Sequence, residues 1–294
     1  MTSYNDRIMG YRFIFGVVLV VAIALLPMAA SASSPQNKGL YISPLRQELT
    51  VNAGKSQPAF FTVANLTDQT MTVSLSVRQF SVADYTYDYK LRSPEQDWIK
   101  LQTTQVQLAP NKSSKISYDV VTPDKTTPGG YYFALVASTD ISGSGLPGTI
   151  QAVSLLYLTV NGNLVRTSVL QNDSIPFLVT GTEIPYQFNV KDTGNVHFSA
   201  YFYGQLEGLF GRHPQVGTSH LLMPGAVRPI GGSIPTPLLP GIYKATYGYK
   251  VDFASFVTVK TAYILFIPPW SVIALVLLIV GGRLFWRKRQ KRSA

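Results

Sequence analysis

Residues 71–77, MTVSLSV, decide the fold class of this chain. Apolar Met71, Val73, Leu75 and Val77 alternate with Thr and Ser, a period of two that is typical of a β-strand burying one face. The same alternation returns at 116–120, 131–135, 196–202 and 243–249. No long segment between the two ends of the chain has the three-and-four spacing of an amphipathic helix. The sequence therefore predicts an all-β protein.

Three pairs of motifs recur in the same order, which indicates two copies of one β unit. The pairs are 61–65 with 188–192, 108–110 with 222–224, and 128–131 with 240–243. Each half has the length and strand content of an immunoglobulin-like β-sandwich. Asn65 and Pro110 are further apart than Asp192 and Pro224, and we assign the extra residues to an insertion at 79–97. The expected sandwiches span 33–145 and 146–262.

The two ends of the chain predict its topology. Arg7 and Arg12 precede an apolar run at 14–26, and 30–32 offers small residues, so we predict a signal peptide over 1–32. A retained N-terminal anchor is the alternative. Residues 263–282 form an apolar stretch that predicts a transmembrane helix, followed by a basic tail at 283–294. The positive-inside rule then places the tail in the cytoplasm and both sandwiches outside a cell membrane that the chain crosses once.

Charge distribution limits the kinds of partner, and cysteine content limits how the sandwiches can be stabilised. The net charge of +10 lies mostly at the two ends, with six basic residues in the last twelve positions. A basic patch on the folded part, which nucleic-acid binding requires, is not visible, so we expect no nucleic-acid partner. The chain has no cysteine, so its sandwiches must be stable without disulfides.

Catalytic and metal-binding patterns are weak in this sequence. His197, His213 and His220 lack the spacing of metal ligands, and we expect ordinary surface histidines. No Gly-x-Ser-x-Gly elbow occurs. Asp84 and Asp88 are the one carboxylate pair that a surface glycan hydrolase would use, although exposed acidic residues are usually only solvated. We therefore predict no catalytic residue, metal or cofactor, and a protein that is not an enzyme.

Tyrosines in the predicted insertion are the candidate binding residues. Tyr85, Tyr87 and Tyr89 share one face if this segment is extended, and together with Asp84 and Asp88 they could contact a sugar or a protein. The alternative is a hairpin whose aromatic face packs on the sandwich. Trp98 is predicted to be a core residue, because Ile99 and Leu101 accompany it at the start of a strand.

The first expected sandwich carries recognisable motifs at 41–44, 63–67, 108–110 and 128–132. With these motifs and the predicted signal peptide, transmembrane helix and basic tail, the chain resembles the WxL-interacting proteins of Gram-positive bacterial surfaces, which pair a peptidoglycan-binding domain with a WxL-binding domain. In the second expected sandwich, the motifs at 194–197, 210–212 and 240–243 look like membrane-anchored surface sandwiches of bacteria. The resemblance to WxL-interacting proteins implies attachment to the cell wall and protein–protein docking, and it brings no catalytic residues.

Together these features predict a non-catalytic, membrane-anchored cell-surface protein. Its expected partners are cell-wall glycan (peptidoglycan) or another surface protein, and the lipid bilayer through the C-terminal helix. A chaperone-like assembly factor for surface appendages, which would donate a strand to an incomplete partner, is the alternative. A hydrolase acting through Asp84 or Asp88 is a third hypothesis.

Overall fold

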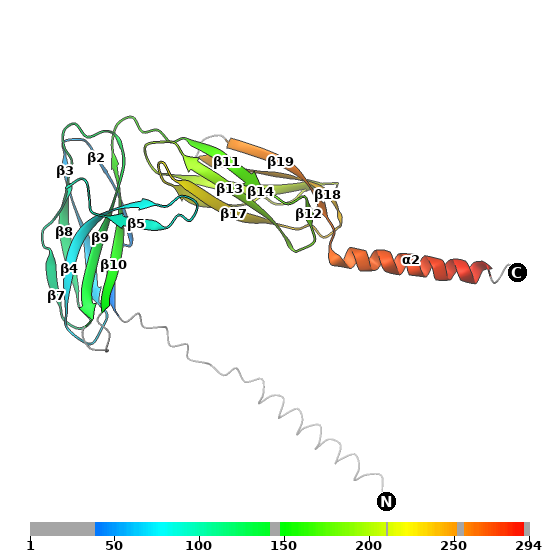
Figure 1. The fold of residues 1–294 in the computed structure, drawn as a ribbon, viewed down its shortest axis with the longest axis horizontal. Coiled ribbons are helices and arrows are strands. Elements are labelled where there is room, and N and C mark those ends of the chain that lie inside the picture. Colours follow the sequence, from blue (N-terminus) through cyan, green and yellow to red (C-terminus); the bar gives the residue numbers. More distant parts are fainter. Residues whose placement is uncertain (1–38, 142–147, 210, 252–255, 291–294) are drawn as a thin grey trace, which may run out of the picture. The chain divides into compact units, whose positions relative to one another are not determined.

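The computed structural model describes residues 39–141, 148–209, 211–251 and 256–290, and in this part the protein is all-β with one helix (Figure 1). This confirms the predicted fold class. The predicted signal peptide over 1–32 and the last four residues of the basic tail lie outside the described residues.

The first sandwich packs two sheets against each other. One sheet has the order β1-β3-β8-β6, and the other has the order β2-β10-β9-β4-β5 with β7 also paired to β4. The strands are β1 (Leu40–Ser43), β2 (Arg46–Val51), β3 (Ser56–Asn65), β4 (Met71–Val82), β5 (Tyr89–Arg92), β6 (Ile99–Leu101), β7 (Gln105–Leu108), β8 (Ser113–Val121), β9 (Gly129–Ile141) and β10 (Gly148–Val160).

The second sandwich repeats this plan. Its sheets have the orders β11-β13-β17 and β12-β19-β18-β14-β15, with β16 paired to β14. The strands are β11 (Ser168–Ser174), β12 (Leu178–Val179), β13 (Glu183–Asp192), β14 (Phe198–Gly208), β15 (Gly211–Arg212), β16 (Val216–Leu222), β17 (Val227–Pro235), β18 (Gly241–Val251) and β19 (Phe256–Phe266).

In both sandwiches the chain enters one sheet and then crosses to the other. Strand β1 pairs antiparallel with β3, whereas β2 pairs parallel with β10. Strands β11 and β12 do the same with β13 and β19. The extra residues of the first sandwich form β5 and the segment leading to β6, where the second sandwich has only the two-residue β15. Pairing thus reproduces the repeat that the motifs indicated.

Alternating apolar residues form the two cores. In β4, Val73 and Leu75 are buried, and in β8 Ile116, Tyr118 and Val120 are buried, as period two requires. Trp98 is partly buried against the first core, with its ring centroid 4.5 Å from that of Tyr131. Each sandwich therefore has a hydrophobic centre of its own.

Two predicted boundaries shift in the structure. Strand β10 pairs with β9 along its whole length, so the first sandwich continues past the expected end at 145 to Val160. At the other end, 263–266 belong to β19 and pair with β18, because Ile264 and Phe266 point into the second core. The helix α2 (Pro269–Gln290) begins later than the predicted span at 263–282. Among the described residues, no helix is both long enough and apolar enough to cross a membrane.

Candidate functional site

The predicted insertion forms a hairpin between β4 and β5 that contacts the second sandwich. Tyr85 and Tyr87 have φ angles of 64° and 61°, in the left-handed region, so the segment is not extended. The segment is therefore a hairpin, which the sequence left open as the alternative, and the extended form that would align the three tyrosines on one face is not present. Asp84 Oδ1 accepts a hydrogen bond from the Val227 amide at 2.8 Å, and the Tyr85 amide donates to the Val227 carbonyl at 3.0 Å.

Tyr85 and Tyr87 of the hairpin both contact residues of the second sandwich. The Tyr87 hydroxyl donates to the Leu221 carbonyl at 3.0 Å, and the Arg228 guanidinium lies 4.4 Å from the centre of its ring. Burial raises the pKa of Tyr87 to about 12. The Tyr85 hydroxyl donates to Gln171 at 3.2 Å. These contacts link the first sandwich to the second, and we call the hairpin between β4 and β5 the clamp.

Tyr89 and Asp88 lie at the start of β5 and remain exposed. Tyr89 packs edge-on against Phe80 with ring centroids 5.6 Å apart. The Asp88 carbonyl accepts from the Ala83 amide and closes the hairpin. Ligand contact by Asp84, Tyr85, Tyr87, Asp88 and Tyr89 stays a prediction.

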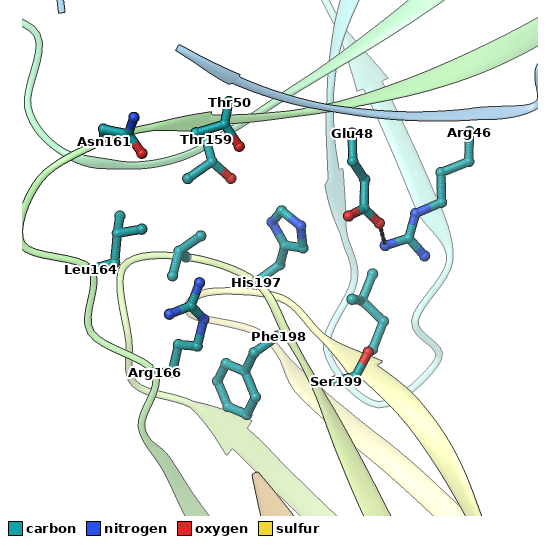
Figure 2. A pocket seen from close by; sticks show the side chains of 12 residues that line it. Arg46, Glu48, Thr50, Thr159, Asn161, Leu164, Arg166, His197, Phe198 and Ser199 are labelled. Carbon is teal, nitrogen blue, oxygen red and sulfur yellow. Dashed lines mark hydrogen bonds and ion pairs between the residues drawn. The ribbon is translucent and has the colours of Figure 1, made fainter. Parts of the chain in front are cut away.

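A cleft of about 400 Å³ lies beside this clamp, between the two sandwiches (Figure 2). Arg46 and Glu48 of β2 form an ion pair at 2.5 Å on one wall, and the Arg46 guanidinium lies 4.3 Å from the Tyr157 ring centre. The rest of the lining comes from Thr50 of β2, the end of β10, the connection that carries Arg166, residues 196–199, and Leu221 of β16. The cleft is polar and charged on both sides.

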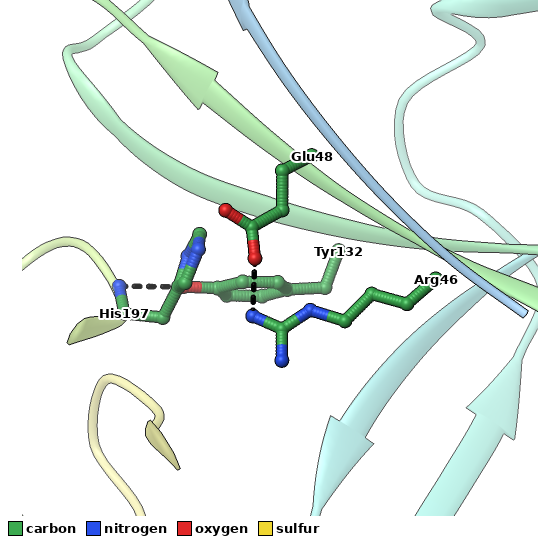
Figure 3. Close-up of polar contacts among 4 residues, drawn as sticks. All are labelled: Arg46, Glu48, Tyr132 and His197. Carbon is green, nitrogen blue, oxygen red and sulfur yellow. Dashed lines mark hydrogen bonds and ion pairs between the residues drawn. The ribbon is translucent and has the colours of Figure 1, made fainter. Parts of the chain in front are cut away.

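His197 stands at the edge of this cleft and is not the surface histidine that the sequence predicted. Its ring packs against both Tyr132 and Tyr157, with centroids 5.5 and 5.0 Å away. The Tyr132 hydroxyl accepts from the His197 amide at 3.0 Å and lies 3.3 Å from Nδ1 (Figure 3). Burial lowers the pKa of His197 to about 4, so the ring is neutral at physiological pH. His197 therefore helps to join the sandwiches.

Asp192 is a second buried titratable group near the junction. It is the counterpart of Asn65 in the repeat, and both side chains are fully buried. The backbone N–H of Asn65 donates to the Lys112 carbonyl, and the backbone N–H of Asp192 makes the equivalent bond to the Ala226 carbonyl. Asn65 Oδ1 accepts from the Thr67 amide at 2.9 Å, as Asp192 Oδ1 accepts from Gly194 at 2.7 Å.

The two side chains differ in their second polar atom, which is Nδ2 in Asn65 and Oδ2 in Asp192. Asn65 Nδ2 donates to the carbonyls of Leu108 and Ala109 at 3.1 Å each. Asp192 Oδ2 stands in the matching position, but it is buried with no hydrogen-bond partner among the described residues. Burial raises the pKa of Asp192 to about 7, so the carboxyl is partly protonated near neutral pH.

Strand β10 presents an open sheet edge. Its residues 155–160 pair with β2, but 148–154 pair only with β9 among the described residues. The Leu155 amide donates outward to the Leu45 carbonyl, so by the period of two the backbone groups of Thr149, Gln151 and Val153 also point outward. Nothing in the sequence patterns marked this edge, because it depends on where β1 crosses to the other sheet.

Metal chemistry gains no support from the site. No group of three or more His, Asp or Glu side chains able to hold a metal ion is found within the described residues.

Comparisons with known proteins give similarities of structure only. No family model and no curated protein matches the sequence. Among solved structures, the class 5 fimbriae chaperone CfaA is 11% identical, with a TM-score of 0.42 over 78% of this chain and 100% of that chain. The E. coli chaperone DraB is 14% identical, with a TM-score of 0.36 over 76% and 97%. One chain of the Salmonella enterica SafA pilin–SafB chaperone complex is 14% identical, with a TM-score of 0.35 over 77% and 96%.

TM-scores this low carry no argument about what the chain does. These neighbours also do not bear on the resemblance to WxL-interacting proteins, which stays a prediction.

Proposed function

We propose that this chain is a non-catalytic protein-binding module that holds an extended segment of another surface protein along the open edge of β10. The observation that carries the proposal is that, in the described part of the chain, 148–154 pair with β9 on one side and with no strand on the other. A strand added here gains main-chain hydrogen bonds in a register set by the sheet.

The sequence of the edge supports this function. Proteins usually protect open edges with charged residues, proline or a bulge. Residues 148–154 read GTIQAVS, without charge or proline, and the pairing with β9 runs without a bulge. Because this edge has none of these features, we expect a partner strand to pair with it.

The side chains along the edge indicate what the partner strand looks like. Ile150 and Ala152 are half-buried and point toward the first core, where Ala152 packs against the core cluster. Gln151 and Val153 point to the opposite face. A bound strand would place every second residue beside Ile150 and Ala152, so we expect it to alternate apolar and polar residues.

This geometry favours the chaperone-like alternative over cell-wall binding. A sheet edge recognises a protein backbone, whereas a glycan requires a platform of exposed rings, and the tyrosine segment is a hairpin and not the extended strand that would align its rings. Binding to peptidoglycan stays a prediction without support from the site.

Site-specific photo-crosslinking in the native host tests the proposal. A photoreactive residue replaces Gln151 in the full chain, and a control chain carries it at Lys115, which is exposed on central strand β8 of the opposite sheet. We expect a discrete protein adduct from position 151 and none from position 115. Adding Val153→Pro, which removes one outward N–H and leaves the β9 ladder intact, should abolish the adduct, whereas Val153→Ala should retain it. An adduct that survives the proline, or no adduct at all, would refute the proposal.

Attachment to a membrane, with both sandwiches outside the cell, is a separate proposal. It is supported by the sequence of the two ends and by α2, where Leu275, Val276, Leu277, Leu278 and Ile279 are all more than half exposed. Consecutive helical residues point about 100° apart, so this part of α2 is apolar on every side, which favours an apolar surrounding. We expect the chain to stay in the membrane fraction through alkaline carbonate washing and to lose its sandwiches to protease on intact cells. Release by carbonate would reject attachment through α2.

A further inference from the structure

The most exposed apolar side chains of the β-structure gather at one place. Outside α2, five described large apolar residues are at least 65% exposed: Phe177, Leu209, Leu238, Ile242 and Tyr263. Leu209 and Leu238 are 97% and 88% exposed, so they contact almost nothing in the chain. Isolated exposed apolar residues are ordinary on protein surfaces, but a gathering of the most exposed ones indicates a binding surface.

Strand pairing shows that these five residues share one end of the second sandwich. Gly241 pairs with Phe266, so β18 begins where β19 ends, and Ile242 is the second residue of β18. Leu209 follows β14, whose Glu207 pairs with Lys244 at the same end. Phe177 precedes β12, which pairs with the last two residues of β19.

Leu238 lies in the connection between β17 and β18. That connection is tied to the same end by the hydrogen bond from the Thr236 amide to the Thr182 carbonyl at 3.1 Å. We call this set of residues the apolar end, comprising Phe177, Leu209, Leu238, Ile242 and Tyr263.

The helix α2 leaves the sandwich from the apolar end. The chain is held to the sandwich through Ile267, whose amide donates to the Val179 carbonyl at 2.9 Å, and Pro268 is buried. The helix α2 then extends away from this end (Figure 1), and its second residue, Trp270, is half exposed. The apolar end is therefore continuous along the chain with the apolar first part of α2, which precedes the basic residues that begin at Arg283.

We propose that the apolar end rests on a phospholipid surface, with Leu209 and Leu238 inserted among the acyl chains and Tyr263 and Trp270 at the headgroups. The proposal rests on membrane attachment through α2. Four facts favour lipid over a protein partner. Phe177, Leu209 and Leu238 lie in three separate connections between strands, and together with Ile242 and Tyr263 they form no continuous strand edge. The set includes the amphipathic ring of Tyr263, and it lies where the chain leaves the sandwich for α2.

Charge at this end predicts which lipids are needed. Two acidic residues at this end, Glu183 and Glu207, are balanced by two basic residues, Arg212 and Lys244. Arg212 forms an ion pair with Glu207 at 3.4 Å. Because these charges balance, contact should depend on apolar insertion and should differ little between neutral and anionic headgroups.

The absence of cysteine makes the test direct. A single cysteine replaces Leu238 in the full chain and carries an environment-sensitive fluorophore, and the matched control carries it at Val259. Val259 is an exposed apolar residue of the same sheet, seven residues before Phe266 and about 23 Å along the strand. Both chains are reconstituted into phosphatidylcholine vesicles, with and without nitroxide-labelled lipid. A Trp98→Phe background leaves Trp270 and Trp286 of α2 as internal reporters.

We expect the tryptophans and the label at 238 to be quenched by the nitroxide lipid, with a blue shift at 238, and the label at 259 to show neither effect. Quenching of the tryptophans without quenching at 238 would overturn this inference and leave membrane attachment standing. Unquenched tryptophans would reject both. A blue shift at 238 that needs no lipid and grows with protein concentration would assign the apolar end to a second copy of the chain and overturn the lipid assignment.

Discussion

Replacing Asp192 by Asn should stabilise the second sandwich, and the gain should depend on pH. Asp192 is fully buried and its pKa is raised to about 7. Its Oδ2 has no partner within the described part of the chain, whereas Asn65 Nδ2 has three carbonyl acceptors. A protonated carboxyl can donate to a carbonyl as the amide does, whereas an ionised one cannot.

The sign and size follow from linkage. In the unfolded chain the carboxyl titrates near its ordinary value of 3.8, and in the folded chain near 7. The folded state therefore holds its proton more firmly, so the stabilisation is complete below the unfolded pKa and is lost as pH rises toward 7. At about 1.4 kcal/mol per pKa unit, the loss amounts to about 4 kcal/mol over this window. Asp192→Asn removes it and should gain about 2–4 kcal/mol at pH 8 but under about 1 kcal/mol at pH 4.

Hydrogen exchange measured by mass spectrometry separates the two sandwiches, since β3 and β13 report on one each. Protection of β13 in Asp192→Asn should exceed that of wild type at pH 8 after correction for intrinsic exchange, and β3 should be unchanged. The mirror variant Asn65→Asp should weaken β3 at pH 8 and spare β13. An equal effect of Asp192→Asn at pH 4 and pH 8, or a loss of protection at pH 8, would show that the buried carboxyl is not protonated as argued.

Three further changes test the packing of the molecule. Phe133→Ala empties a fully buried site in the first core and should cost about 3–5 kcal/mol in urea denaturation, whereas Phe60→Ala, at a half-exposed ring, should cost far less. Asp84→Ala leaves the Val227 amide without its acceptor. Hydrogen exchange of the Val227 amide should accelerate about tenfold, which corresponds to a loss of about 1.4 kcal/mol in local stability. Unchanged exchange would show that the hairpin does not hold the second sandwich at this point. Tyr87→Phe removes the bond to Leu221 and should destabilise the junction by about 1 kcal/mol, seen as faster exchange in β5 and not in β3.

The sequence by itself determined the strands and the two cores. Alternation at 71–77 and 116–120 specifies which residues are buried, because side chains on a strand point to opposite faces in turn whatever lies beside it. The repeated motifs at 61–65 and 188–192 likewise became the ends of β3 and β13. These features are local, so a single sequence carries them.

Only the tertiary structure decided which edges and surfaces are free. The open edge of β10 exists because the chain crosses from β1 to β2 at Pro44, and no local pattern states where a distant strand stops pairing. The tyrosine hairpin bends because it meets the second sandwich, and 263–266 became strand because β18 offered a partner to an apolar run that also suits a helix. Pairing and docking are decided between residues far apart in the chain, which is why periodicity alone could not predict them.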